Sequence, residues 1–119
     1  MALSSSGHTV REHFENRAPA VKATYDAILK AAKKLGPVRE EAKKTSIHLT
    51  RKTAFAGVAT RKSGLTLTLK ADSDIQSERI AKRERVSANR WHLEVRLEAP
   101  TQVDAELITW LKRAYDLSE

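Results

Sequence analysis

The stretch LTLTLK at residues 65–70 decides the fold class of this chain. Its leucines alternate with threonines and a lysine, and this two-residue period is typical of a β-strand with one buried and one exposed face. The same alternation occurs in IHLT at residues 47–50 and in WHLEVRL at residues 91–97. These stretches predict a sheet whose leucine, isoleucine and valine side chains face a core, while threonine, histidine and charged side chains face solvent.

Two further segments extend the predicted sheet. FAGVAT at residues 55–60 predicts another strand, and the basic segments at residues 51–53 and 61–64 predict hairpin turns on either side of it. Residues 71–90 are dense in charge and have too few apolar residues for a helix, so we expect a loop and a short strand near residues 80–86. The segments together predict an antiparallel meander of four to five strands.

Helical periodicity precedes the sheet. Apolar residues recur at helical spacing from Val21 to Leu35, which predicts an amphipathic helix that begins near Pro19 and stops at Gly36 and Pro37. Upstream, Thr9 and the glutamate three residues later have the spacing of a capping box, which predicts one short helical turn.

A second helix is predicted after the sheet. Val103, Leu107, Trp110 and Ala114 form an apolar stripe, and we expect Thr101 to cap this helix with an aspartate three residues later at capping-box spacing. Because both helices are amphipathic, both can pack on the apolar face of the sheet.

The predicted fold class is therefore α+β, a two-layer sandwich. It has an N-terminal helix, an antiparallel meander of four to five strands, and a C-terminal helix packed on one sheet face. The length of 119 residues suffices for one core and is too short for two. We expect residues 9–118 to form one domain after a disordered lead at residues 1–8.

Composition excludes several classes of protein. The chain has no cysteine, which excludes disulfides, thiolate nucleophiles and cysteine-ligated zinc. The N-terminus has no apolar run of signal-peptide length, and no apolar stretch is long enough to span a bilayer. We therefore expect a cytoplasmic protein with no membrane partner.

Charge is distributed unevenly along the chain. The net charge is +7, and residues 43–96 carry +8 while residues 97–119 carry −3. The excess of cations thus falls on the predicted sheet, and a localised basic surface attracts polyanions or acidic proteins. Ordinary surface ion pairs and solubility would produce the same composition, so charge alone does not define a site.

Segments at residues 43–49, 55–56 and 91–97, and a tail that includes Trp110, Leu111 and Tyr115, carry a resemblance to a known family. Together they resemble the bacterial family called domain of unknown function 5655, sometimes labelled a predicted transport protein. The likeness spans roughly residues 12–117. Because this family has no established activity, the resemblance implies no catalytic residue, and nothing in the sequence supports the transport label.

Histidines are the first candidates for site chemistry. His48 and His92 share the parity of the threonines on their strands, so both should emerge on the polar face. If their strands are neighbours, the two imidazoles could form an anion or metal site. No paired Asp, Glu or His spacing surrounds either residue, so we predict no metal site.

Enzyme motifs are incomplete. Glu41-Ala42-Lys43 matches half of a metal-dependent nuclease motif, but no strand-borne acid is predicted upstream to hold magnesium. Neither a nucleophile elbow nor a phosphate-cradling glycine loop occurs in the sequence. We therefore predict no catalytic residues and no cofactor, and an enzyme acting on a small anionic substrate remains the third hypothesis.

The favoured hypothesis is a non-enzymatic binding module with a basic sheet face for a polyanion such as nucleic acid. Trp91 and Trp110 have inward parity, so no aromatic platform is predicted and binding should not depend on base sequence. The alternative is a protein-interaction or homodimerisation domain that uses an exposed sheet edge or an acidic partner. The predicted ligand-binding residues are Lys44, His48, Arg51, Lys52, Arg61, Lys62, His92 and Arg96.

Overall fold

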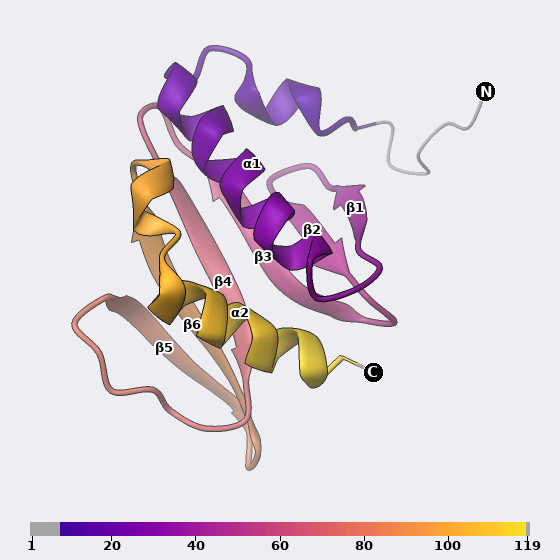
Figure 1. Ribbon diagram of the computed structural model, residues 1–119, viewed down its shortest axis with the longest axis vertical. Coiled ribbons are helices and arrows are strands. Elements are labelled where there is room, and N and C mark those ends of the chain that lie inside the picture. The colour runs from indigo at the N-terminus through magenta and orange to yellow at the C-terminus, as the bar shows by residue number, and fades with distance from the viewer. Residues whose placement is uncertain (1–7, 119) are drawn as a thin grey trace.

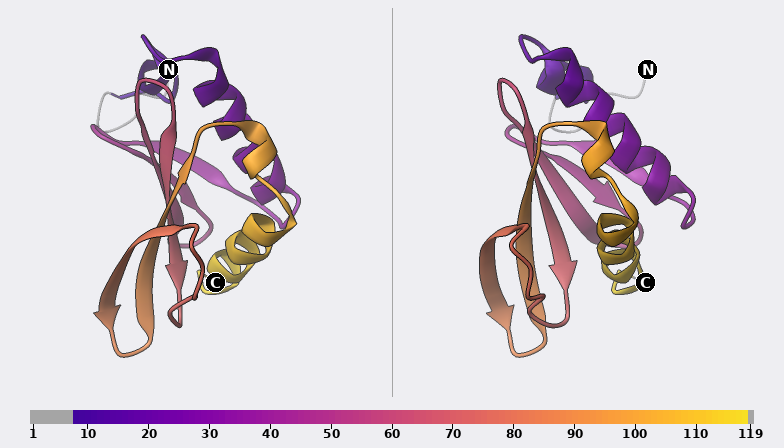
Figure 2. Two further views of the ribbon diagram at one scale, coloured as in Figure 1. Left: turned by 90° about the vertical axis from the view of Figure 1, so that its left-hand side faces the viewer. Right: turned by 60° about the vertical axis from the view of Figure 1, so that its left-hand side comes forward.

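The computed structural model describes residues 8–118 and has two layers, a twisted sheet and a pair of helices on one of its faces (Figures 1 and 2). The disordered lead predicted for residues 1–8 lies, apart from His8, outside the described residues. The helical elements are η1 (Arg11–Phe14), α1 (Pro19–Lys33), η2 (Pro100–Gln102) and α2 (Ala105–Asp116). The strands are β1 (Arg39–Ala42), β2 (Ile47–Thr50), β3 (Ala54–Thr60), β4 (Leu65–Ala71), β5 (Ile80–Ser87) and β6 (Arg90–Leu97). The predicted α+β class is confirmed.

The predicted sheet differs from the structure in strand number and order. Within residues 8–118 the sheet has six strands in the order β1-β2-β3-β4-β6-β5, all antiparallel to their neighbours. The extra strand is β1, whose sequence Arg-Glu-Glu-Ala lacks an apolar alternation because it is an edge strand that is at most half-buried. A simple meander is wrong beyond β4, because the chain then runs to the far edge as β5 before β6 pairs with β4.

The alternating leucines face the helices as predicted. Leu67 pairs with Val58 on one side and Val95 on the other, and all three side chains are buried. A bulge between β2 and β3, opposite Leu49 and Thr50, places one extra residue in β3. Neighbouring β3 residues 55 and 56 are consequently both buried, although strict alternation would expose one of them. The helices complete the core with Val21, Tyr25, Ile28, Leu107, Leu111 and Ala114.

Two of the three predicted helix starts are confirmed. Thr9 and Glu12 form the capping box, in which each backbone N–H donates to the other residue's side-chain oxygen at 3.1 and 3.3 Å. Pro19 is the first residue of α1. The predicted Thr101 cap is wrong, because that residue lies within η2 and α2 is capped by Asp104, which accepts from the Leu107 N–H at 3.1 Å.

The C-terminal ends of α1 and α2 meet at the turn between β2 and β3. The Tyr115 hydroxyl donates to the Pro37 carbonyl at 3.1 Å, and the Arg51 guanidinium donates to the Tyr115 carbonyl at 3.1 Å. Gly36 follows α1 with φ of +151°, and a Cβ there would collide with the Tyr115 hydroxyl. Gly36 is therefore required both by its backbone conformation and by this close approach.

Replacing Gly36 should destabilise the protein. We expect Gly36→Ala to lower the free energy of unfolding by about 1–3 kcal/mol, because it adds backbone strain and displaces Tyr115. Urea denaturation measures the change. Gly57→Ala is the matched control, since a Cβ at Gly57 meets only His48 Cδ2 at 3.7 Å and should cost little. Equal stability of the two variants would contradict the prediction.

An arginine joins the connection between β4 and β5 to the start of α2. Arg79 Nη1 donates to Asp104 Oδ1 at 2.9 Å and to Glu106 Oε1 at 3.1 Å, and its Nη2 donates to the Gln102 carbonyl at 2.7 Å. Its guanidinium also lies 5.7 Å from the centre of the Trp110 ring. The hydrogen bond from Arg79 is the main reason that the pKa of Asp104 lies below its usual value.

This arrangement predicts an acid-dependent loss of stability. Because the pKa of Asp104 is lower in the folded state, its ionised form stabilises the fold above the unfolded-state pKa, and this contribution is lost as the pH falls through the folded-state pKa. We expect Arg79→Gln to have a lower free energy of unfolding than wild type at neutral pH. This difference in stability should become smaller below about pH 4. Denaturation at both pH values measures it. Arg96→Gln, at an exposed position on β6, is the control, and its difference in stability from wild type should not depend on pH in this way. A stability difference for Arg79→Gln that stays the same at both pH values would contradict the prediction.

Candidate anion-binding face of the sheet

The sheet has one face that its helices leave open. Figure 2 shows α1 and α2 on the same side of the sheet, and neither helix reaches the opposite side. Strand parity places the polar residues of β2, β4 and β6 on this open face, as the sequence predicted. These residues are His48, Thr66, Thr68, Lys70, His92, Glu94 and Arg96.

A hollow runs along β3 on this face because β3 presents only small side chains there. Gly57 lies between His48 of β2 and Thr68 of β4 in the sheet register, and Ala59 follows on the same face. The hollow encloses about 280 Å³. We call it the β3 trough, and its lining residues are Ser46, His48, Ala54, Phe55, Ala56, Gly57, Ala59, Thr68, Lys70 and His92.

The polar groups of the trough favour an anion. They comprise two imidazoles, two hydroxyls and the ammonium of Lys70, and no carboxylate belongs to the lining. In the sheet register, acidic side chains lie beside three of the lining residues, with Glu41 beside His48, Glu94 beside Thr68 and Glu84 beside His92. The open face as a whole is thus mixed in charge, whereas the lining of the trough itself has no carboxylate.

The two histidines flank the trough instead of meeting. His48 is on β2 and His92 is on β6, and β3 and β4 lie between them, so the two strands are roughly 14 Å apart. His92 Nδ1 lies 3.7 Å from Glu84 Oε1. A joint histidine site requires the strands of His48 and His92 to be neighbours. Because β2 and β6 are not neighbours, the two imidazoles do not form such a site. Among residues 8–118, no three His, Cys, Asp or Glu side chains are grouped to hold a metal ion.

Lys70 is the cation closest to the trough, and its surroundings are unusual. Its Nζ donates to Thr53 Oγ1 at 3.1 Å and to Ser118 Oγ at 2.9 Å, and no carboxylate of the described residues pairs with it. Burial lowers the pKa of Lys70, and the positive charge of Arg90 lowers it further. A bound anion would offset the repulsion between Lys70 and Arg90.

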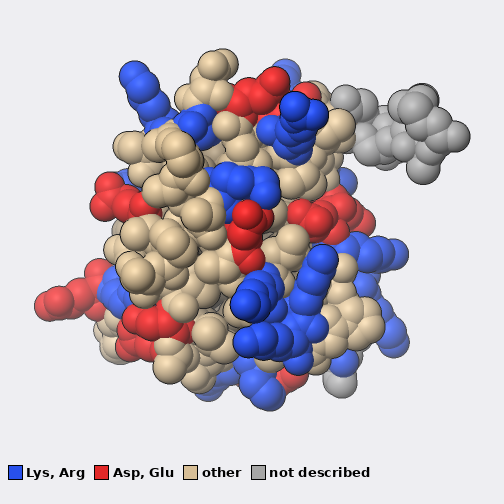
Figure 3. All heavy atoms as spheres, turned by 45° about the horizontal axis from the view of Figure 1, so that its top comes forward, with Lys and Arg blue, Asp and Glu red and all other residues tan. Residues whose placement is uncertain are grey.

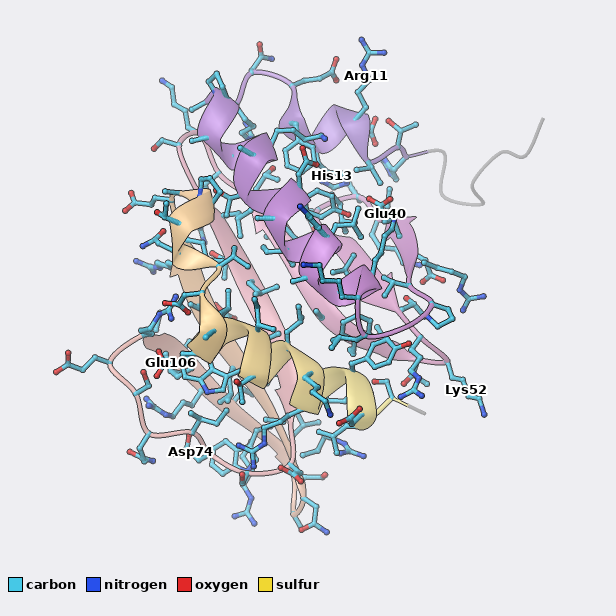
Figure 4. All side chains as sticks on the ribbon, viewed as in Figure 1. Arg11, His13, Glu40, Lys52, Asp74 and Glu106 are labelled. Atoms are coloured by element: carbon cyan, nitrogen blue, oxygen red, sulfur yellow. The ribbon has the colours of Figure 1, made fainter. Side chains whose placement is uncertain are left out.

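Four of the predicted cations lie at the two ends of β3. Arg51 and Lys52 belong to the turn before this strand, and Lys52 projects from the molecule there (Figure 4). Arg61 and Lys62 belong to the turn after it, about 23 Å away for a seven-residue strand. The structure therefore separates the two pairs, with the trough between them.

The contacts of the predicted cations differ. Arg51 lies half-buried over the Tyr115 ring, 4.3 Å from its centre, and thus points to the end of α2. Arg61 Nε donates to Thr66 Oγ1 at 3.2 Å on the open face, and Arg96 pairs with Thr66 across β4 and β6. Lys44 lies in the turn between β1 and β2 and is not part of the trough lining.

Lysines and arginines also gather on the helix side of the molecule, as the space-filling view shows (Figure 3). Lys30 and Lys33 in the last turn of α1 contribute to this side, together with Lys34. Cations at a helix C-terminus favourably oppose the negative end of the helix dipole, so these residues have a structural explanation. The basic charge is therefore not confined to the open face.

The predicted ligand-binding residues did not include Gly57, Lys70 or Arg90. Glycine inside the otherwise apolar β3 was the available signal, since an isolated glycine in a strand often marks a bulge or a close approach. Arg90 could not be assigned, because its proximity to Lys70 depends on the pairing of β4 with β6, two strands that are not consecutive in the chain.

The fold and the face define a small two-layer α+β domain with an open, trough-bearing sheet. The chain belongs to the family described as Domain of unknown function (DUF5655), which matches residues 10–118. No curated protein and no solved structure matches the chain. None of the helices in residues 8–118 has the length and apolar character needed to cross a membrane.

Filling the trough should leave the fold intact. We expect Gly57→Val to be as stable as wild type or more stable by up to about 1 kcal/mol, because a β-branched residue favours a strand and nothing obstructs its Cβ. Urea denaturation tests this, with Ala81→Val at an exposed position of β5 as the control. A strongly destabilised Gly57→Val would show that the floor of the trough is not open.

Proposed function

We propose that this chain is a non-enzymatic binding module that captures a polyanion, such as single-stranded nucleic acid, along the β3 trough. One observation carries the proposal: a hollow whose lining has no carboxylate runs along β3, with paired cations in the turns at both ends. An extended polyanion following β3 would reach Lys52 at one end and Arg61 and Lys62 at the other.

The expected mechanism is electrostatic capture with hydrogen bonds inside the trough. Lys52, Arg61 and Lys62 are exposed, so they suit phosphate contacts whose affinity depends on the release of counterions. Within the trough, His48 and Thr68 offer hydrogen-bonding groups to phosphate oxygens. These contacts recognise the backbone of a polyanion and carry no base sequence information.

The arrangement of the tryptophans supports binding without base specificity. Trp91 lies opposite Ala71 in the register and has Arg85 5.9 Å from its ring centre, so it does not line the trough. Trp110 belongs to α2 and is buried in the core. Bases would therefore lack an aromatic stacking partner in the trough, and sequence preference should be weak.

The rival, self-association through a sheet edge, has less support. The outer edge of β5 is exposed, but the strand carries Lys82, Arg83, Glu84 and Arg85 in succession. Charged side chains on an edge strand resist pairing with a second chain. Val86 is the only large apolar side chain of the described residues that is exposed, which is too small a patch for a stable interface.

Salt dependence tests the proposal. We expect a labelled single-stranded oligonucleotide to bind at about 50 mM salt and to lose about 50-fold in affinity at about 200 mM, as for roughly four phosphate contacts. The triple variant Lys52→Gln, Arg61→Gln, Lys62→Gln should bind weakly, with a shallower salt slope. Gly57→Val, which fills the trough without changing charge, should also weaken binding. Fluorescence anisotropy measures both.

The matched control is a triple variant that removes three positive charges from a different part of the surface. Lys30→Gln, Lys33→Gln, Lys34→Gln removes the same number of cations from the exposed helix side, and it should retain most of the affinity. Equal losses for the two triple variants would mean that net charge, and not the trough, drives binding. Absence of any binding at low salt would reject the proposed function.

A further inference from the structure

The trough is not uniform along its length, because Lys70, the one cation of its lining, lies near the end formed by Ala54. On β4 and β6, Lys70 pairs with His92, and Arg90 lies two residues before His92 on the same face of the sheet. Side chains diagonal to one another across two strands are about 7–8 Å apart at their origins, within reach of lysine and arginine. Lys70 and Arg90 thus place two positive charges together.

Among residues 8–118, no carboxylate pairs with either of these two charges, and the only side-chain partners of Lys70 Nζ are the hydroxyls of Thr53 and Ser118. The nearby Glu84 lies 3.7 Å from His92 and belongs to the outermost strand. Adjacent unpaired cations repel each other, and an anion between them would relieve that repulsion.

The hydrogen bonds of Lys70 to Thr53 and Ser118 also mark where the trough ends. The Lys70 side chain reaches from β4 to Thr53, the residue before β3, and to Ser118 after α2. The lining of the trough stops at the next residue, Ala54. A chain-like ligand lying in the trough therefore meets this bridge of lysine and hydroxyls and has to end or turn away there.

We propose that the Lys70 end of the trough is a subsite for a terminal phosphate group, with Lys70 and Arg90 as its cationic contacts. This inference rests on the proposed function and names the part of the ligand that this end recognises. A terminal phosphate monoester carries about −1.5 to −2 charges at neutral pH, whereas an internal diester carries one, so two unneutralised cations favour the terminal group. Charge-assisted hydrogen bonds from both cations would supply the discrimination.

Oligonucleotides of one sequence, with and without a terminal phosphate, test the inference. Wild type should bind a strand phosphorylated at its 5′ or 3′ end on the order of tenfold more tightly than the unphosphorylated strand. Arg90→Gln and Lys70→Gln should lose this preference. Lys82→Gln, which removes one exposed cation from β5 outside the trough, should keep it. Lys70→Gln also removes two hydrogen bonds from the fold. If Lys70→Gln is unstable, the result for Arg90→Gln decides the test.

A second arm separates this inference from the proposed function. Titration with a nucleoside monophosphate and with inorganic phosphate, followed by amide shifts around Gly57 and Lys70, distinguishes a nucleotide end from free phosphate as the source of the group. Shifts lost in Arg90→Gln would support the subsite even if no oligonucleotide binds. Salt-dependent binding with equal affinity for both strands, and no shifts with either small phosphate, would overturn the subsite while leaving polyanion capture in place.

Discussion

The burial of Leu67 at the centre of the sheet is the constraint on which the structure depends. Leu67 lies between Val58 and Val95, under the apolar stripes of α1 and α2, and is fully buried. Removing a leucine side chain from such a position costs about 2–5 kcal/mol, so the orientation of β4 is strongly fixed. Since side chains alternate along a strand, fixing Leu67 inward forces Thr66 and Thr68 outward. The open face is thus a direct consequence of the core.

The trough follows from the same constraint together with one sequence choice. With Val58 directed inward, Gly57 and Ala59 must lie on the open face, where they leave a depression between β2 and β4. The charges then follow from topology, because the turns that bound β3 carry Lys52 at one end and Lys62 at the other. Packing energy, strand parity and the position of one glycine together create the trough, and the turns at the ends of β3 place cations beside it.

Much of the fold could be predicted from periodicity, because local spacing fixes which side of an element is apolar. The stripe from Val21 to Leu35 located α1, and the alternation around Leu67 located β4. Predictions failed where long-range pairing overrides local pattern. β1 has no apolar alternation because it is an exposed edge, and β5 departs from meander order because the chain crosses to the far edge. The cap moved from Thr101 to Asp104 because Pro100 starts a separate turn.

The sequence by itself determined which residues are apolar, which face of each strand they occupy, and that the cations concentrate between residues 43 and 96. It also determined that His48 and His92 share the polar face. Only the tertiary structure decided that β3 and β4 separate these histidines, and that Arg51 turns toward the end of α2. It alone placed Lys70 beside Arg90 without a carboxylate partner. The reason is physical: parity along a strand is a local property, whereas strand order is set by pairing between segments distant in the chain.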